Sequence, residues 1–155
     1  MYKYSGGFEM IIVFCGHSDY IQNAQDKIKI LNILEGEVGD APCEILLGGY
    51  GNFDAFAFAC ARKFKRCHTA VKLTLVVPYL KKSKQIYPKE EFDSVVYPSL
   101  ESVPPRYAIT RRNRWMIEQA DIVVSYVSRQ YGGAYTMYLN AKRKGKKTYN
   151  IGSLK

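Results

Sequence analysis

Short apolar runs alternate along the chain with longer segments in which apolar residues recur at helical spacing. The apolar runs predict strands, because such runs are typical of strands buried on both faces; they cover residues 10–15, 44–47, 72–77, 121–126 and 147–151. The segments with helical spacing predict helices over residues 22–34, 53–65, 104–120 and 134–143. Strands that alternate with helices form parallel βαβ units. The pattern therefore predicts an α/β fold with a doubly wound, mainly parallel sheet and helices on both faces.

Residues 79–104 have no regular apolar pattern and contain Pro88, Pro98 and Pro104. A linker of this length inside a compact domain is typical of a lid or binding loop, unless it contains a further element. Residues 94–97 are a candidate for such an element, a short strand. A chain of 155 residues is close to the commonest domain size. We therefore expect one domain over 1–155, with its core at about 10–151 and a lid-like loop at 79–104.

Two glycine-rich turns occupy matching positions, each between a predicted strand and a predicted helix. The first contains Gly48, Gly49 and Gly51, and the second contains Gly132 and Gly133. Glycine lets the backbone approach a ligand closely, and a helix that begins there directs free N–H groups and partial positive charge at it. The two turns predict a phosphate-bearing ligand between two helix N-termini. Neither turn is Gly-x-Gly-x-x-Gly and no Walker lysine follows, which disfavours standard NAD enzymes and P-loop NTPases.

Residues at the starts of these helices add candidate polar contacts. Asn52 is a candidate N-cap for the helix that begins at residue 53. Asp54 lies in the first turn of that helix, where it either pairs with the helix dipole or acts on a ligand, by binding a ribose hydroxyl or as a general acid or base. Thr136 supplies a hydroxyl after the second turn. Tyr50 and Tyr135 lie in or beside the turns and could stack on a base.

The turn after the first strand is expected at the same edge of the sheet. Ligands of doubly wound sheets bind outside the carboxyl ends of the strands. Gly16 and His17 follow the first strand directly, so this rule brings them towards both glycine-rich turns. His17 could contact a phosphate or a base, and a capping or surface role is the alternative.

Arg112 and Asn113 fall on the inward stripe of their predicted helix, together with Ile109 and Met116. A guanidinium on a core-facing stripe must be paired or must line a cavity. If it faces the glycine-rich turns, Arg112 could hold a phosphate bidentately. The alternative is an exposed arginine that extends along the surface towards solvent. Asp54 and Arg112 are also the candidate catalytic residues.

Charge and cysteine content narrow the class of ligand and the compartment. The net charge is +9, which favours polyanions or small anionic ligands, although a solvated basic surface is the simpler interpretation. The cysteines are Cys15, Cys43, Cys60 and Cys67. Their spacing forms no zinc motif with either histidine, so we expect reduced, mostly buried thiols, no metal and no cofactor. No apolar run is long enough to span a membrane and no signal pattern is present, so we expect no membrane contact and a cytoplasmic protein.

Several of these segments together resemble the SLOG superfamily. The matching stretches are Phe14–His17, Gly48–Ala57, Arg112–Met116, Ala120–Asp121 and Gly132–Ala134. That superfamily joins the DNA-processing A (Smf) proteins, the LOG phosphoribohydrolases and small stand-alone relatives such as YpsA. The resemblance covers residues 10–151 and implies a Rossmann-like domain. The first turn is similar to the Gly-Gly-x-x-Gly-x-Asp element of the DNA-processing proteins, which implies a ligand role for Gly48, Gly49, Gly51 and Asp54.

The second half is similar to the LOG stretch that ends in Gly-Gly-x-Gly-Thr and a catalytic glutamate. Gly132, Gly133 and Thr136 match it, but Tyr135 replaces the third glycine. Tyr138 and Leu139 occupy the positions of the acid, so the resemblance implies a binder of a nucleotide or nucleotide-derived ligand without turnover. The alternatives are a hydrolase of the N-glycosidic bond of nucleoside monophosphates and a DNA-binding module like the DNA-processing proteins. The oligomeric state stays open, a homo-oligomer included.

Overall fold

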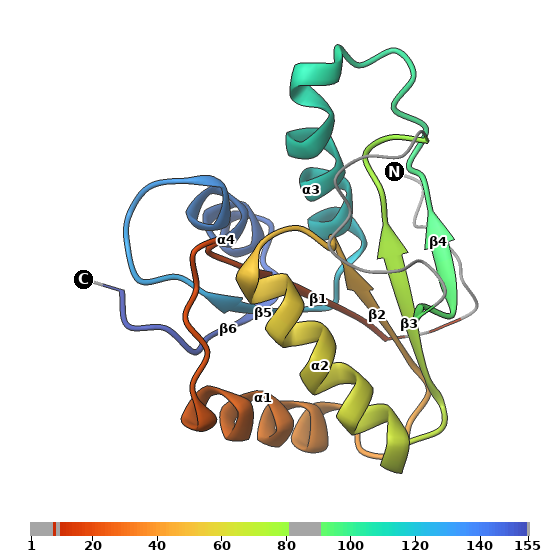
Figure 1. Ribbon diagram of the computed structural model, residues 1–155, viewed down its shortest axis with the longest axis vertical. Coiled ribbons are helices and arrows are strands. Elements are labelled where there is room, and N and C mark those ends of the chain that lie inside the picture. Colours follow the sequence, from red (N-terminus) through yellow and green to blue (C-terminus); the bar gives the residue numbers. More distant parts are fainter. Residues whose placement is uncertain (1–7, 9, 81–90, 155) are drawn as a thin grey trace.

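The computed structural model describes residues 8, 10–80 and 91–154 (Figure 1). These residues form one sheet of parallel strands in the order β4-β3-β2-β1-β5-β6. The strands are β1 (Ile11–Gly16), β2 (Cys43–Leu47), β3 (Val71–Val76), β4 (Ser94–Val96), β5 (Ile122–Tyr126) and β6 (Lys147–Asn150). The helices are α1 (Ala24–Glu37), α2 (Asn52–Cys67), α3 (Ala108–Gln119) and α4 (Gly133–Arg143), with the 3₁₀ turn η2 (Pro105–Tyr107) before α3.

The helices cover both faces of the sheet, which confirms the predicted doubly wound α/β fold. One core contains apolar residues of α1 and α2 with Ile12 and Phe14 of β1. The other contains Met116 of α3 and Ala141 of α4 with Ile11 and Val13 of the same strand. Successive residues of β1 face opposite cores because side chains alternate across a strand. This double burial explains why β1 is a continuous apolar run.

The strand order changes direction between β1 and β5. From β1 the chain adds β2, β3 and β4 on one side, and then crosses over to place β5 and β6 on the other. The connections after β1 and β5 therefore leave the sheet in opposite directions, which opens a crevice at the carboxyl ends of these strands. The edge of the sheet at which a ligand is expected thus lies where the loops after Gly16 and Tyr126 diverge.

One predicted helix cap is wrong, and one candidate strand is confirmed. Asn52 is the first residue of α2 and is not its N-cap; the cap is Gly51, whose φ of 93° and ψ of 171° are accessible to glycine. The Asn52 N–H instead donates to the Ser18 carbonyl at 2.9 Å. In the predicted 79–104 loop, residues 81–90 lie outside the described residues. The candidate strand is confirmed as β4, which pairs with β3.

The cysteines in the structure are free thiols. Cys15, Cys43 and Cys60 are buried and Cys67 is exposed, which agrees with the expected reduced and mostly buried thiols. Burial raises the pKa of the Cys60 thiol to about 11, so this group stays protonated at neutral pH. Among the described residues, no helix has both the length and the apolar character needed to cross a membrane.

His68 links α2 to the end of α1. Its Nε2 lies 2.7 Å from Glu35 Oε1, its Nδ1 lies 2.9 Å from Asp40 Oδ1, and its ring stacks on Phe64. The two carboxylates raise the pKa of His68, and the largest cause is the hydrogen bond that His68 donates to Glu35. This interaction therefore stabilises the fold fully below the ordinary histidine pKa of about 6.5 and is lost as pH rises through the raised pKa.

We expect His68→Gln to lower the melting temperature most at about pH 5.5–6, and less as the pH rises towards 9, because the wild type loses its charged contacts there. Melting curves of both proteins across this range measure the difference. Arg66→Gln, an exposed change in the last turn of α2, is the control and should shift the melting temperature equally at all these pH values. A His68→Gln effect that does not change with pH would contradict the prediction.

Candidate functional site

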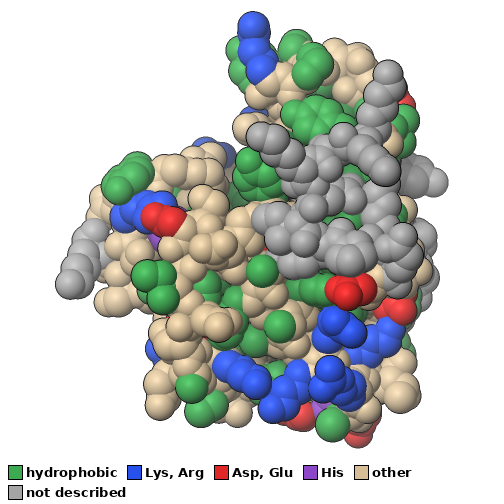
Figure 2. Space-filling view, viewed as in Figure 1, with side chains coloured by type: hydrophobic (Ala, Val, Ile, Leu, Met, Phe, Trp, Pro, Cys, Tyr) green, Lys and Arg blue, Asp and Glu red, His purple; other side chains and the backbone are tan. Residues whose placement is uncertain are grey.

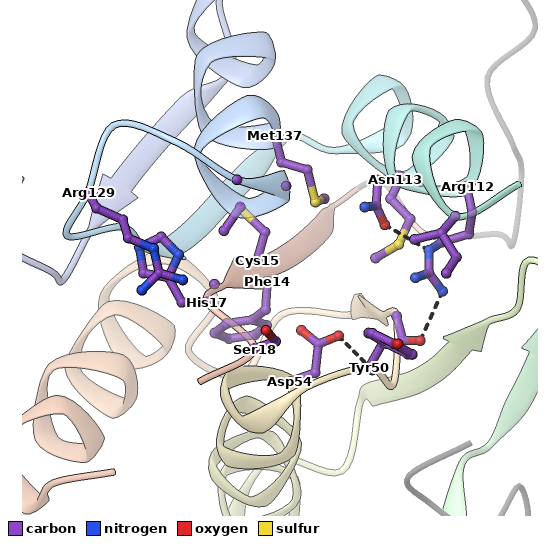
Figure 3. Close-up of a pocket in the computed structure, with 17 residues that line it drawn as sticks. Phe14, Cys15, His17, Ser18, Tyr50, Asp54, Arg112, Asn113, Arg129 and Met137 are labelled. Atoms are coloured by element: carbon purple, nitrogen blue, oxygen red, sulfur yellow. Dashed lines mark hydrogen bonds between the residues drawn. The ribbon is translucent and has the colours of Figure 1, made fainter. Parts of the chain in front are cut away.

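A cavity of about 280 Å³ lies at the carboxyl edge of the sheet, where the loops after β1 and β5 diverge. Residues from the end of β1, the turn after β2, the loop after β5, and helices α2, α3 and α4 converge on it (Figure 3). The lining residues are Phe14, Cys15, Gly16, His17, Ser18, Gly48, Tyr50, Asp54, Ile109, Arg112, Asn113, Met116, Arg129, Gly132, Gly133, Ala134 and Met137. The cavity therefore unites both glycine-rich turns with the inward face of α3.

The two glycine-rich turns end in nearly the same backbone conformation. Gly51 caps α2 with φ 93° and ψ 171°, and Gly132 caps α4 with φ 92° and ψ 174°. This region of φ/ψ space is essentially restricted to glycine. The surroundings differ, however: a Cβ on Gly51 would lie 2.7 Å from the Ser18 Cα, whereas a Cβ on Gly132 or Gly133 would meet nothing within 4 Å. The α2 turn is thus packed against the chain, and the α4 turn is open.

The open end of α4 has unused hydrogen-bond donors. The Gly132 carbonyl accepts from the N–H and the hydroxyl of Thr136, both at 3.1 Å. Within the described residues, no acceptor engages the N–H groups of Gly133 and Ala134. These two residues line the cavity, so the partial positive charge of the helix end acts there. An anion is the ligand that such a helix end favours.

Arg112 joins α3 to the ends of β2 and β3. Its side chain is buried, with only 2% of the residue exposed. One terminal nitrogen, Nη1, donates to the carbonyls of Gly48 at 2.9 Å and Val76 at 2.7 Å, and Nε donates to Asn113 Oδ1 at 2.8 Å. Nη1 and Nε are therefore occupied in the free protein, and the bidentate grip on a phosphate stays a prediction. The other nitrogen, Nη2, has no acceptor among the described residues.

Asp54 is a buried carboxyl close to Arg112. A Cβ on Gly48 would lie 3.2 Å from Asp54 Oδ2 and 3.2 Å from Arg112 Nη2, so the carboxyl and the guanidinium both lie beside the Cα of Gly48. The Tyr50 N–H donates to Asp54 Oδ2 at 2.9 Å. Desolvation raises the pKa of Asp54 to about 6, although this hydrogen bond and Arg112 both oppose the rise. The carboxyl can therefore exchange a proton near neutral pH.

His17 and Arg129 form the wall of the cavity on the β5 side. His17 is 4% exposed, and its Nε2 accepts from the Ser128 N–H at 3.0 Å. Burial lowers the pKa of His17, and the positive charge of Arg129 lowers it further, so the ring stays neutral. Arg129 forms a two-pronged ion pair with Asp19 at 3.0 and 3.1 Å. Its Nε is buried without a hydrogen-bond partner.

The structure brings most of the predicted site residues together. Eight of them line the cavity: Gly16, His17, Gly48, Asp54, Arg112, Asn113, Gly132 and Gly133. Gly49, Gly51 and Thr136 do not. Gly49 has a φ of 64° and shapes its turn, Gly51 packs on Ser18, and Thr136 faces a neighbouring groove. Gly16 has a steric role as well, because a Cβ there would lie 2.3 Å from the Phe53 ring.

Sequence reasoning missed Arg129, Cys15 and Met137, which also line the cavity. Arg129 could have been found, because it follows β5 at the point where the strand order reverses. Cys15 and Met137 carry no sequence signal beyond that of ordinary core residues. Among the residues that the structure describes, no group of three His, Cys, Asp or Glu side chains could hold a metal ion.

We expect Gly51→Ala to destabilise the protein more than Gly132→Ala. Both substitutions impose the same backbone strain of about 1–3 kcal/mol, but only the first also forces a methyl group into the Ser18 backbone. The additional steric conflict should cost about 1–3 kcal/mol. Urea unfolding of the two variants measures this difference, and equal losses of stability would show that the two turns are equally free.

No protein-family model and no curated protein matches the chain. Among solved structures, it is similar to DNA processing protein A from Streptococcus pneumoniae, at 16% identity and TM-score 0.62, over 91% of this chain and 49% of that one. It is also similar to DNA processing protein A from Helicobacter pylori, at 14% identity and TM-score 0.62, over 91% of this chain and 64% of that one. A third similar structure is the molybdenum cofactor carrier protein from Chlamydomonas reinhardtii, at 14% identity and TM-score 0.51, over 90% of this chain and 75% of that one.

The chain thus spans about half the length of the streptococcal protein and 64% of the Helicobacter protein. At these identities the similarity establishes the fold alone. DNA-processing proteins are one of the groups that the SLOG resemblance names, and the Rossmann-like fold which that resemblance implies is confirmed.

Proposed function

We propose that this chain binds a nucleotide or a nucleotide-derived ligand, with a phosphate held at the N-terminus of α4. The observation that carries the proposal is a set of unpaired donors around one cavity. The N–H groups of Gly133 and Ala134 and the Nη2 of Arg112 all belong to residues that line it, and none has an acceptor among the described residues. A phosphate oxygen would accept from these donors, and its charge makes such hydrogen bonds stronger than neutral ones.

The opposite wall suits the nucleoside part of the ligand. Asp54 presents a carboxyl that can accept a hydrogen bond from a ribose hydroxyl. Tyr50 lines the same cavity with 51% of its surface exposed, and its ring is free to stack on a base. Figure 3 shows Asp54 and Tyr50 together on the side of the cavity away from Met137. The ligand would therefore lie across the cavity from α2 to α4.

Helix α4 contains no carboxylic acid, which favours binding without turnover. Tyr138 and Leu139, at the positions of the LOG acid, do not line the cavity. Tyr138 packs under the Lys142 ammonium, and Leu139 is 44% exposed. Among the described lining residues, Asp54 is the sole carboxylic acid. The raised pKa of Asp54, about 6, is the observation that supports the second candidate function, hydrolysis of an N-glycosidic bond with Asp54 as general acid.

DNA binding ranks third. The Helicobacter pylori relative is described as binding single-stranded DNA, and the net charge of +9 suits a polyanion. Figure 2, however, shows Lys and Arg side chains gathered at the end of the molecule where α2 terminates. On α2, Arg62 pairs with Glu91 and Lys65 pairs with Asp93. Positive charge at this helix C-terminus has a simpler explanation in the helix dipole.

We expect Gly133→Asp to abolish nucleotide binding and leave the fold intact. A Cβ at this position meets nothing within 4 Å, and an acidic residue in the first turn of α4 interacts favourably with the dipole, by about 0.3–1 kcal/mol. The new carboxylate would occupy the phosphate position and repel it. Gly133→Asn, which is neutral and of the same shape, is the matched control and should retain more affinity.

A thermal-shift screen against nucleoside mono-, di- and triphosphates makes the measurement, since ligand at about 100 times its dissociation constant adds about 2.7 kcal/mol. Calorimetry then gives the affinities. If no nucleotide shifts the wild type, or if Gly133→Asp binds as tightly as Gly133→Asn, the proposed phosphate position is wrong.

The hydrolase alternative predicts a reaction product. We expect no free base when nucleoside monophosphates are incubated with the wild type and separated by chromatography, because α4 supplies no acid. Asp54→Asn keeps an oxygen that can accept from the Tyr50 N–H, so it should still bind. Free base that forms with the wild type and disappears with Asp54→Asn would favour the enzyme over the binder.

A further inference from the structure

A second cavity lies between α3 and α4 and adjoins the first. Its volume is about 230 Å³, and its lining residues are Thr110, Asn113, Arg114, Gly133, Thr136, Met137, Asn140 and Arg143. Asn113, Gly133 and Met137 line both cavities. The residues from α4 recur at helical spacing, so they form one face of that helix. We call this second cavity the α3–α4 groove; it starts at the open N-terminus of α4 and runs along the helix.

The groove is lined by hydrogen-bond donors and contains no acidic side chain among the described lining residues. Arg114 and Arg143 supply two guanidinium groups. Asn140 is buried, with 9% of the residue exposed. Its Oδ1 accepts from Arg143 Nη2 at 3.2 Å, while its amide nitrogen has no acceptor among the described residues. This amide nitrogen belongs to a residue that lines the groove, so it can donate to an acceptor on a ligand there.

Asn113 lines both cavities, and its amide group is oriented like that of Asn140, with the oxygen towards an arginine. Its Oδ1 accepts from Arg112 Nε at 2.8 Å, so the amide nitrogen is directed away from Arg112, as Figure 3 shows. Thus the Arg112–Asn113 and Arg143–Asn140 contacts each use an amide oxygen, and the amide N–H groups have no acceptor among the described residues. The groove and the junction both present donors, which an anion requires.

We infer that the α3–α4 groove is a second anionic subsite, and that the ligand is a nucleotide whose 5′-phosphate is extended by further phosphate groups. This inference rests on the proposed function, in which the first phosphate lies at Gly133. Because Gly133 belongs to both cavities, a chain attached to that phosphate enters the groove, while the nucleoside stays near Asp54. From Gly133 to Asn140 the helix rises about 10 Å, the reach of a short polyphosphate.

The test compares nucleoside 5′-monophosphates with the matching 5′-triphosphates of the four common bases, by calorimetry in the presence of a chelator. The wild type should bind at least one triphosphate about tenfold or more tightly than its monophosphate, because two guanidinium contacts are added. The double variant Arg114→Gln/Arg143→Gln should lose this gain and keep its affinity for the monophosphate. Arg111→Gln, exposed on α3 and outside both cavities, is the control for net charge and should keep the gain.

The outcomes separate the two proposals. If the monophosphate binds but the triphosphate binds no tighter, or if the gain survives in the double variant, the groove is not a phosphate subsite and the proposed function still stands. A gain lost equally in Arg111→Gln would show general charge attraction and would also overturn the inference. If neither nucleotide binds the wild type, the proposed function fails, and the groove assignment fails with it.

Discussion

The buried guanidinium of Arg112 ties the carboxyl ends of two strands to helix α3, and the cavity depends on this contact. Its hydrogen bonds to the carbonyls of Gly48 and Val76 fix the turns after β2 and β3. These carbonyls are neutral, so the positive charge is only partly compensated, and burial lowers the pKa of Arg112 despite the nearby Asp54. An incompletely compensated cation in a buried position costs stability. Its position at the edge of the cavity agrees with the proposed role in binding an anion.

The electrostatic design of the cavity is asymmetric. Donors dominate the side formed by α3 and α4, where the first N–H groups of α4, Arg112 and Asn113 face the cavity and the α3–α4 groove. On the α2 side, Asp54 is the acidic group. A molecule with an anionic end and a hydroxyl-bearing end matches this division. The fold itself gives no such information, because one fold serves many activities and function depends on the site.

The two glycine-rich turns look equivalent in sequence and have nearly equal dihedral angles, yet they serve different purposes. Gly51 accommodates the loop after β1, since Ser18 packs where its side chain would lie. Gly132 has the same backbone conformation with open space around it. A glycine in open space lets a ligand approach the backbone closely. The α4 turn is therefore the better candidate for contact with a ligand, and the α2 turn mainly supports the wall of the cavity.

The sequence by itself determined the strands, the helices and the parallel direction of the strands, because strands buried on both faces, β1 above all, must be continuously apolar. The same logic found the edge of the sheet where the cavity lies and eight of its lining residues. Local pattern could not reveal which donors stay unpaired. In the free protein Arg112 donates to Gly48, Val76 and Asn113, and Ser18 packs against Gly51. Both outcomes depend on contacts between residues distant in sequence, which only the tertiary structure decides.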